Sequence, residues 1–370
     1  MDSVSKVDVD GHRDPKFVSS PTDYLFEQCH AASIVRVPED GTMLAVWFAG
    51  TREKHPDTAI WMSILKPSSH TWSAPVQKWK VRDDAHWNPV LFSNGKHVMC
   101  FFKVGRDIET WETYVSKMHP DGSWSEPETL VRWPSSGKGG RGPVRSKPIV
   151  LASGRWLAPA SCERIVSYQT KQHPTMKWMI LRVPLQIWDS FVDISDDEGK
   201  SWKRSKMVPY SRKKWGEYGG LIQPTMWESS SIVHMLIRSN QGQLFRSDSD
   251  DQGQTWSEAD ETGIPNPNSA VDIQTMEDGT LILAHNPVSG DWAPRTPLSI
   301  SYSTDDGCSW SDPTDVESGK GSFSYPFMIP EKDGFSMSYT WMRTGIACVR
   351  YAVSKCGDVR SLEKIPVNPM

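Results

Sequence analysis

The chain has 370 residues, of which 23% are charged, and its formal net charge is −4. This balance gives no electrostatic reason to expect a nucleic acid or an anionic membrane as partner, and no apolar run approaches the roughly 18 residues of a transmembrane helix. The 18 tryptophans, 26 glycines and 27 prolines instead favour many short strands joined by turns.

The N-terminal stretch, residues 1–20, is polar and predicts a flexible lead-in without the apolar core of a secretory signal. We therefore expect a cytoplasmic protein, or a secreted one if a signal was removed. The six cysteines lack C-x-x-C spacing, so neither a zinc site nor a disulfide framework is predicted, and no metal or cofactor is expected.

From residue 21 onward, one element recurs: a strand, a tight turn and an apolar strand. Asn-Gly or Asp-Gly between two apolar runs is a strong signal for a β-hairpin. Six such hairpins are predicted, the fourth with a degenerate turn, at residues 31–48, 89–102, 148–159, 224–238, 272–284 and 325–339.

A second repeat has the pattern S-x-D-x-G-x-[ST]-W and occurs at residues 195–202, 249–256 and 303–310. Its aspartate can accept hydrogen bonds from the turn backbone, its glycine supplies positive φ, and its tryptophan covers apolar surface. The tryptophans at 202, 256 and 310 recur every 54 residues, which indicates an array of similar units. These acids resemble a catalytic cluster, but turn chemistry accounts for them.

Together, the two repeats predict an all-β, six-bladed β-propeller with Asp-box turns, extending over residues 21–356 and followed by a tail at 357–370. Closure is expected to place residues 342–353 beside the N-terminal strand. The widest spacing between hairpins, residues 163–220, predicts a longer loop on one face.

Ligands of propellers bind where loops converge at the central channel, so site residues come from several units. Polar residues that begin or end the predicted inner strands are therefore candidates: His30, Arg52, Asp57, His86, Glu228, Arg238, Arg295 and Tyr325. A residue of any of these types at such a position is more often a surface or packing residue. Together they would form an anion-binding pocket with acid–base groups.

Over residues 25–352, the Asp-boxes and hairpin units resemble the sialidase (neuraminidase), BNR/Asp-box repeat superfamily. That resemblance implies a six-bladed propeller with its active site at the pore. It also implies three arginines that bind a substrate carboxylate, an aspartate general acid/base, and a tyrosine nucleophile paired with a glutamate.

On this resemblance, Asp57 fits the acid/base and Arg52 the arginine associated with the same loop. Glu228 precedes a strand that ends at Arg238, so Glu228 fits the partner of the nucleophile and Arg238 a carboxylate-binding position. Tyr325 opens the last hairpin, where the family keeps its nucleophile.

Arg295 fits a further carboxylate-binding position. At the first such position, however, His30 stands where the family has an arginine, so a permanent cation is replaced by a titratable imidazole. His86 is a candidate for the substrate site, although packing explains it as well, and Arg343 is a further candidate binder.

Three functions remain open. The first is a sialidase-like glycoside hydrolase acting on a terminal acidic or modified sugar, with Asp57, Glu228 and Tyr325 catalytic. The second is a lyase, in which His30 or Tyr325 abstracts a proton α to the carboxylate of a uronate or small acid. The third is a non-catalytic propeller that binds a glycan or protein. In each case we expect a monomer whose partner is a carbohydrate, a small acid or, for the third, a protein.

Overall fold

The computed structural model describes residues 16–19, 25–131, 140–172, 180–356 and 359–365. Strands dominate these residues, among which lie one 3₁₀-helix, η1 (Ile108–Thr110), and one short α-helix, α1 (Arg212–Trp215). Within the described ranges, no helix is both long and apolar enough to cross a membrane.

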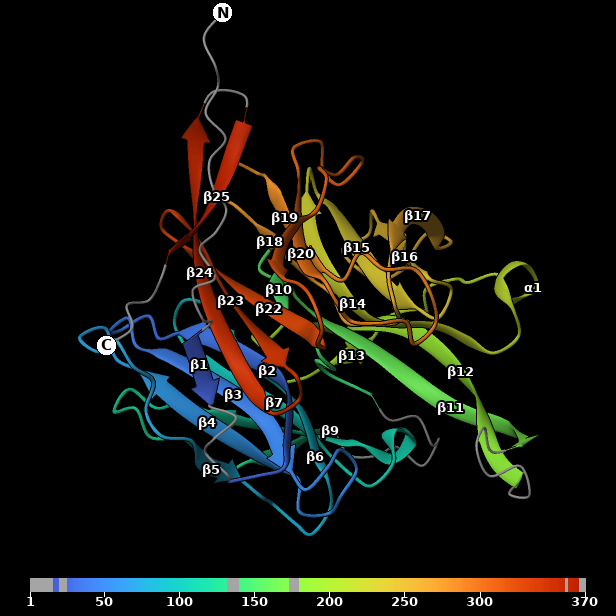
Figure 1. Ribbon diagram of the computed structural model, residues 1–370, viewed down its shortest axis with the longest axis horizontal. Coiled ribbons are helices and arrows are strands. Elements are labelled where there is room, and N and C mark those ends of the chain that lie inside the picture. Colours follow the sequence, from blue (N-terminus) through green and yellow to red (C-terminus); the bar gives the residue numbers. More distant parts are fainter. Residues whose placement is uncertain (1–15, 20–24, 132–139, 173–179, 357–358, 366–370) are drawn as a thin grey trace, which may run out of the picture.

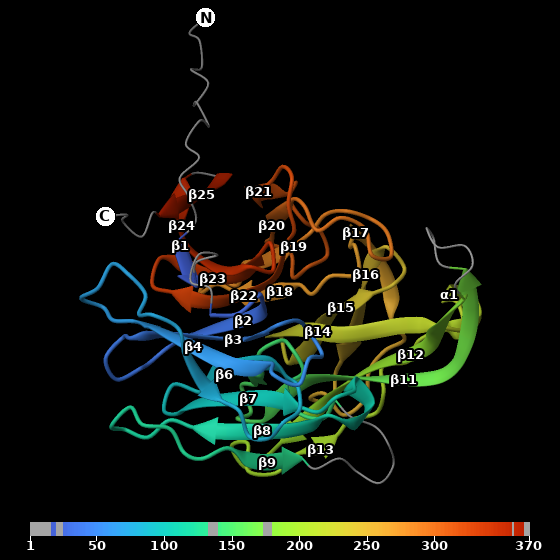
Figure 2. The same cartoon turned by 60° about the horizontal axis from the view of Figure 1, so that its bottom comes forward.

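Three sheets each contain four antiparallel strands in chain order (Figures 1 and 2). The first comprises β2 (Gln28–Arg36), β3 (Met43–Gly50), β4 (Ala59–Leu65) and β5 (Val76–Trp79). The second comprises β6 (His86–Ser93), β7 (Val98–Val104), β8 (Glu112–Lys117) and β9 (Glu128–Val131). The third comprises β18 (Asp272–Thr275), β19 (Leu281–His285), β20 (Leu298–Ser303) and β21 (Thr314–Glu317).

An eight-stranded sheet consists of two antiparallel halves joined by a short parallel contact between β12 and β14. Its first half comprises β10 (Ile149–Val150), β11 (Trp156–Gln172), β12 (Ile180–Ser195) and β13 (Lys203–Arg204). Its second half comprises β14 (Gly219–Ser229), β15 (Ile232–Ser239), β16 (Gln243–Ser249) and β17 (Asp260–Pro265). Each half is therefore a unit like the separate sheets.

The last sheet joins the two ends of the described chain. It contains β22 (Phe323–Glu331), β23 (Gly334–Trp341) and β24 (Gly345–Cys356), with β1 (Lys16–Ser19) and β25 (Val359–Ile365) both paired to β24. Residues 342–353 were expected beside the N-terminal strand of the propeller, and most of them lie in β24, which pairs with β1. β1 and β25 lie within the expected lead-in and tail, but both are paired because β24 offers backbone groups to each.

All six predicted hairpins are confirmed as antiparallel pairs: β2–β3, β6–β7, β10–β11, β14–β15, β18–β19 and β22–β23. At four of the junctions between neighbouring units, the first strands also contact one another. β2 contacts β6 and β22, and β18 contacts β14 and β22. The hydrophobic core lies between adjacent sheets, where Val46 and Phe48 of one unit pack with Leu91 and Phe102 of the next.

The Asp-box acids are engaged in their own turns. Asp251 accepts hydrogen bonds from the backbone N–H groups of Gln254 and Thr255 at 2.9 Å and from the Thr255 hydroxyl at 2.7 Å. The tryptophan of the same box, Trp256, is buried in a hydrophobic cluster. The geometry of this box is that of a structural turn.

Four of the first strands contain the same irregularity, a β-bulge with one residue at positive φ. The residues are Ala31, Asn88, Gln223 and Tyr325, with φ between 41° and 58°. A bulge turns a side chain out of the regular alternation of a strand, and such strained residues gather at functional sites. Three of these four residues line the cavity described next.

Candidate active site

A cavity of about 190 Å³ lies at the bulged strands. It brings together five of the sequence candidates and several other residues. The five candidates are His30, Arg238, Arg295, Tyr325 and Arg343, and they are joined by the acids Glu53 and Glu163, the amides Asn88 and Gln223, and the tryptophans 87, 111, 188 and 292.

Tyr325 lies among three arginines, Arg238, Arg295 and Arg145. Its hydroxyl accepts a 2.8 Å hydrogen bond from Nη1 of Arg238, and the guanidinium groups of Arg295 and Arg145 lie 5.4 and 5.3 Å from its ring centroid. Burial by itself raises the pKa of Tyr325, but the charges of Arg238 and Arg295 outweigh burial and lower that pKa below its ordinary value. The phenol of Tyr325 is therefore more acidic than that of an ordinary tyrosine.

The hydrogen-bond partners of Arg238 are neutral. Its Nε donates to Oδ1 of Asn268 at 2.7 Å, and its Nη1 donates to Oε1 of Gln223 at 2.8 Å as well as to Tyr325. Arg295 donates to the backbone carbonyl of Asn268 at 3.2 Å. Arg343, in contrast, pairs with Glu53 at 2.6 Å. Arg238 and Arg295 therefore have charge available for an anionic ligand.

Arg145 is bonded to the backbone of Tyr325. This side chain is fully buried, and its Nη2 donates to the backbone carbonyls of Tyr325 at 2.6 Å and of Pro326 at 3.0 Å. Burial lowers the pKa of Arg145 to about 10, which still leaves the group cationic at neutral pH. Arg145 both fixes the bulged backbone and adds positive charge next to the phenol.

His30 lies against Tyr325, with 4.0 Å between the ring centroids. Its Nδ1 shares a 2.9 Å hydrogen bond with the Thr340 hydroxyl. Burial, and then the nearby charge of Arg343, hold the pKa of His30 well below its ordinary value. The imidazole is therefore neutral at physiological pH.

Glu163 is the carboxyl group that the long β11–β12 pair contributes to the cavity, together with Gln186 and Trp188. Burial raises the pKa of Glu163 to about 7, even though Arg238 and Lys54 act in the opposite direction. Near neutral pH this side chain is present both as a proton donor and as a carboxylate.

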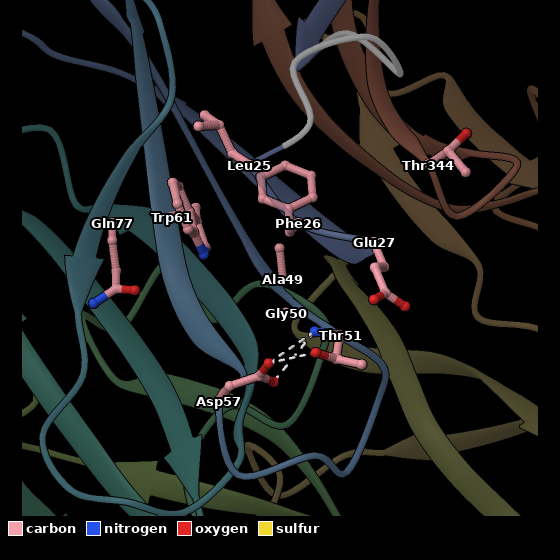
Figure 3. A pocket seen from close by; sticks show the side chains of 10 residues that line it. All are labelled: Leu25, Phe26, Glu27, Ala49, Gly50, Thr51, Asp57, Trp61, Gln77 and Thr344. Carbon is pink, nitrogen blue, oxygen red and sulfur yellow. Dashed lines mark hydrogen bonds between the residues drawn. The ribbon is translucent and has the colours of Figure 1, made fainter.

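Asp57 and Arg52 do not line this cavity. Asp57 lies at a separate pocket of about 680 Å³, where it accepts hydrogen bonds from the N–H and hydroxyl of Thr51, as Figure 3 shows. It also contacts Nδ1 of His55 at 2.7 Å. Arg52 lines neither pocket, and its backbone carbonyl accepts a hydrogen bond from the hydroxyl of Thr58.

Glu228 and His86 are also engaged elsewhere. The Glu228 carboxylate accepts a 2.8 Å hydrogen bond from the backbone N–H of Ala152. It lies five residues beyond Gln223 on β14, about 16 Å along an extended strand. The ring nitrogens of His86 form hydrogen bonds with the backbone carbonyl of Asp84 and the backbone N–H of Val81. Burial lowers the pKa of His86 to about 4. Neither side chain faces the Tyr325 hydroxyl.

Sequence reasoning missed Gln223, Glu163 and Arg145. Gln223 lies fifteen residues before Arg238, but only the bulge register shows that it faces that arginine. Glu163 is recognisable only once its strand is known to continue into the cavity wall. Arg145, in an apparent loop before the third hairpin, has no distinguishing sequence signal. Among the described residues, no group of three His, Cys, Asp or Glu side chains is arranged to hold a metal ion.

The fold and the cavity together define an all-β protein of sialidase-like fold, built from repeated antiparallel units, with a cavity lined by arginines and a tyrosine. Residues 41–337 match the BNR repeat-like domain, and the chain belongs to that family.

Solved structures show the same fold. A protein of unknown function from Dyadobacter fermentans has 15% identity and a TM-score of 0.63, with 95% of this chain and 94% of that chain covered. Trypanosoma rangeli sialidase in complex with the inhibitor DANA has 15% identity and a TM-score of 0.61, with 88% and 55% covered. The K499G mutant of NanB sialidase from Streptococcus pneumoniae has 12% identity and a TM-score of 0.63, with 90% and 69% covered. This chain thus spans about half the length of the trypanosomal enzyme. No curated protein matches the sequence.

Proposed function

We propose that the six units close into a six-bladed β-propeller and that the cavity at their first strands is the active site of a lyase acting on a uronate-containing glycan. Contacts between the first strands at four of the junctions, including the one between the first and last units, support the closure. The observation that carries the function is the hydrogen bond from Arg238 to the Tyr325 hydroxyl, inside a cavity whose arginines lower the pKa of that phenol.

The substrate class follows from the charge available in the cavity. Arg238 and Arg295 contact amide and carbonyl oxygens, and buried cations without carboxylate partners are stabilised by an anionic ligand. A sugar carboxylate supplies that charge, and the tryptophans of the cavity wall offer apolar surface to a sugar ring.

The reaction is a β-elimination. The Tyr325 phenolate removes the proton on the carbon next to the carboxylate, while the arginines stabilise the negative charge that develops on the carboxylate. The electron pair of the broken C–H bond forms a C=C bond, and the C–O bond to the leaving sugar breaks with its electron pair on oxygen. Protonated Glu163 transfers its proton to that oxygen. The products are an unsaturated uronate and the released alcohol.

The positions of three side chains favour elimination over a tyrosine nucleophile paired with a glutamate. The side chain of β14 that faces Arg238 and Tyr325 is the amide of Gln223, which cannot accept a proton from the phenol. Glu228 and Asp57 make their hydrogen bonds outside the cavity. A phenolate base needs neither the glutamate partner nor the aspartate acid/base of that mechanism.

Hydrolysis of sialidase type is the second candidate, because Glu163 brings one carboxyl group with a raised pKa into the same cavity. In that reaction Tyr325 would attack the anomeric carbon, and Glu163 would protonate the leaving oxygen. The fold of the similar sialidases is compatible with this reaction.

One experiment separates these candidates. The wild-type protein is incubated with uronate-containing oligosaccharides and, separately, with a fluorogenic sialoside. A product with ultraviolet absorbance that is not formed by Tyr325→Phe supports the lyase, whereas sialoside turnover supports the hydrolase. Binding of acidic glycans without turnover of either substrate would contradict both and leave a binding protein.

A further inference from the structure

β11 and β12 form a two-stranded ribbon that extends away from the other sheets (Figures 1 and 2). The two strands pair with each other from Trp156–Ser195 to Gln172–Ile180. Their neighbours β10, β13 and β14 pair only near the core end, the last of them at Ile187 and Trp188. Beyond that point the ribbon has no further strand beside it among the described residues.

The register of the ribbon shows which residues share the cavity face. Cross-strand partners lie on the same face, and every second pair returns to that face. Glu163 and Trp188 are partners, and both line the cavity; the next pair on that face joins Ile165 to Gln186, which also lines it.

A bulge at Val166 then advances β11 by one residue relative to β12. As a result, the cavity face continues outward through Tyr168–Pro184, Thr170–Arg182 and Gln172–Ile180. Without this bulge, Tyr168 would be on the opposite face. The extra residue therefore keeps one continuous surface from the cavity to the outer ribbon.

That surface, which we call the ribbon face, is exposed, apolar and cationic. Tyr168 and Ile180 have exposed fractions of 49% and 69%, and the Arg182 guanidinium lies 4.7 Å from the centroid of the Tyr168 ring. Along the five pairs of the ribbon face, Glu163 in the cavity is the only acid. An arginine stacked on an aromatic ring keeps its donors free for an anion while the ring offers apolar surface.

We propose that the ribbon face binds the polymeric part of an acidic glycan, one uronate of which occupies the cavity with a sugar attached to its β carbon. This inference rests on the proposed function and specifies its substrate class as an oligosaccharide or polysaccharide instead of a small free acid. Two observations favour a glycan over a second copy of the chain. The ribbon face is continuous with the cavity wall through Gln186 and Trp188, and its outer part carries a cation without an acid.

The test measures binding, so it does not depend on turnover. The Tyr325→Phe variant is titrated calorimetrically with galacturonic and glucuronic acids and with oligogalacturonates and hyaluronan oligosaccharides of increasing length. We expect the affinity to rise at least about tenfold from the free acid to the longer oligomers, which is about 1.4 kcal/mol of binding free energy.

Adding Tyr168→Ala or Arg182→Ala should remove most of that increase and leave the affinity for the free acid unchanged. The matched control is Gln169→Ala, because Gln169 is next to Tyr168 and lies on the opposite face of the ribbon. This control should keep the full increase with length. Thermal unfolding curves identify any variant that fails to fold, and Tyr168→Phe, which retains the ring, should bind like the parent.

Several results would overturn the proposal. Affinity that does not depend on length, or a length dependence that survives Tyr168→Ala and Arg182→Ala, would show that the ribbon face does not hold the glycan, with the cavity assignment unaffected. A dimer in light scattering that Tyr168→Ala dissociates would assign the face to a second copy. Length-dependent binding without turnover by the wild-type protein would support the ribbon face and contradict the lyase. No binding at any length would contradict both.

Discussion

Arg238 donates a 2.8 Å hydrogen bond to the hydroxyl oxygen of Tyr325 and meets its other side-chain partners, Gln223 and Asn268, only through amide oxygens. A buried guanidinium whose partners are neutral stabilises negative charge on the phenol more than one neutralised by a carboxylate. This relationship lowers the pKa of Tyr325 and suits the phenol to the acid–base role that we propose for it.

Replacing Tyr325 by Phe should abolish elimination because the base is removed while the ring remains. We expect kcat to fall by about 10²–10⁴-fold, the usual contribution of a positioned acid–base group. The measurement is the rate of formation of the ultraviolet-absorbing product. Tyr302→Phe, a half-buried tyrosine on β20, is the control and should retain activity. Undiminished activity of Tyr325→Phe would exclude the phenol as the base.

Arg238→Met should raise the pKa of Tyr325, because Arg238 is the largest of the charges that lower it. Tyrosinate absorbance is titrated against pH, and the Tyr325 contribution is obtained by subtracting the titration of Tyr325→Phe. The lysine variant, Arg238→Lys, keeps the charge but not the planar donor geometry, so its shift should be smaller. A titration that is identical in wild type and Arg238→Met would refute the electrostatic coupling.

Glu163→Gln should lower kcat for substrates with a poor leaving group and have little effect on kcat for substrates with a good one. A general acid matters most when the departing oxygen needs a proton. We therefore expect kcat to fall by about 10²-fold or more for a sugar leaving from the carbon β to the carboxylate, and far less for a nitrophenolate leaving from the same carbon. Because burial raises the pKa of Glu163 to about 7, wild-type kcat for the sugar substrate should show an apparent pKa near that pH. Equal losses for both leaving groups would argue instead for a structural role of Glu163.

The sequence was informative where short-range chemistry determines structure. Asp-Gly turns between apolar runs identified the hairpins, and the Asp-box pattern identified turns whose aspartates bond to their own backbone, as at Asp251. The positions of Tyr325, Arg238 and Arg295 at the ends of predicted strands indicated residues that now share one cavity.

The sequence could not show which side chains face the cavity where their orientation depends on the register of the strands. Glu228 and Gln223 are on the same strand, and the bulge at Gln223, together with the strand direction, determines which of them faces the phenol. Asp57 was expected in the site, but its bonds to Thr51 hold it at another pocket. The expected long loop over residues 163–220 begins with most of the β11–β12 ribbon, whose apolar pattern is too mixed to reveal a paired strand.

Asp251→Ala should destabilise the fold without changing the site. The substitution removes four hydrogen bonds to the Asp251 carboxylate, those from Ser249, Gln254 and the N–H and hydroxyl of Thr255, and we expect a loss of about 1–3 kcal/mol in the free energy of unfolding. Denaturant unfolding measures the change, and the adjacent exposed Asp250→Ala is the control. A large loss of activity in folded Asp251→Ala would indicate that the Asp-box acid has a role in the site after all.

The stability of the protein should fall as the pH is lowered below neutrality, because its buried histidines resist protonation. Burial lowers the pKa of His285 to about 4, from an ordinary value of 6.5. Above pH 6.5 the native and unfolded states are both neutral at this position, so the free energy of unfolding does not depend on pH there. Between about pH 6.5 and 4 the unfolded chain binds a proton that the native protein does not, and each such histidine costs up to about 1.4 kcal/mol per pH unit. Below the pKa of His285 in the folded protein, the loss of stability stops.

His285→Gln should therefore reduce the difference in unfolding free energy between pH 7 and pH 5 by about 2 kcal/mol, as measured in denaturant at both pH values. The exposed His97→Gln should leave that difference unchanged, and an unchanged difference in His285→Gln would show that this residue is not the source of the acid sensitivity.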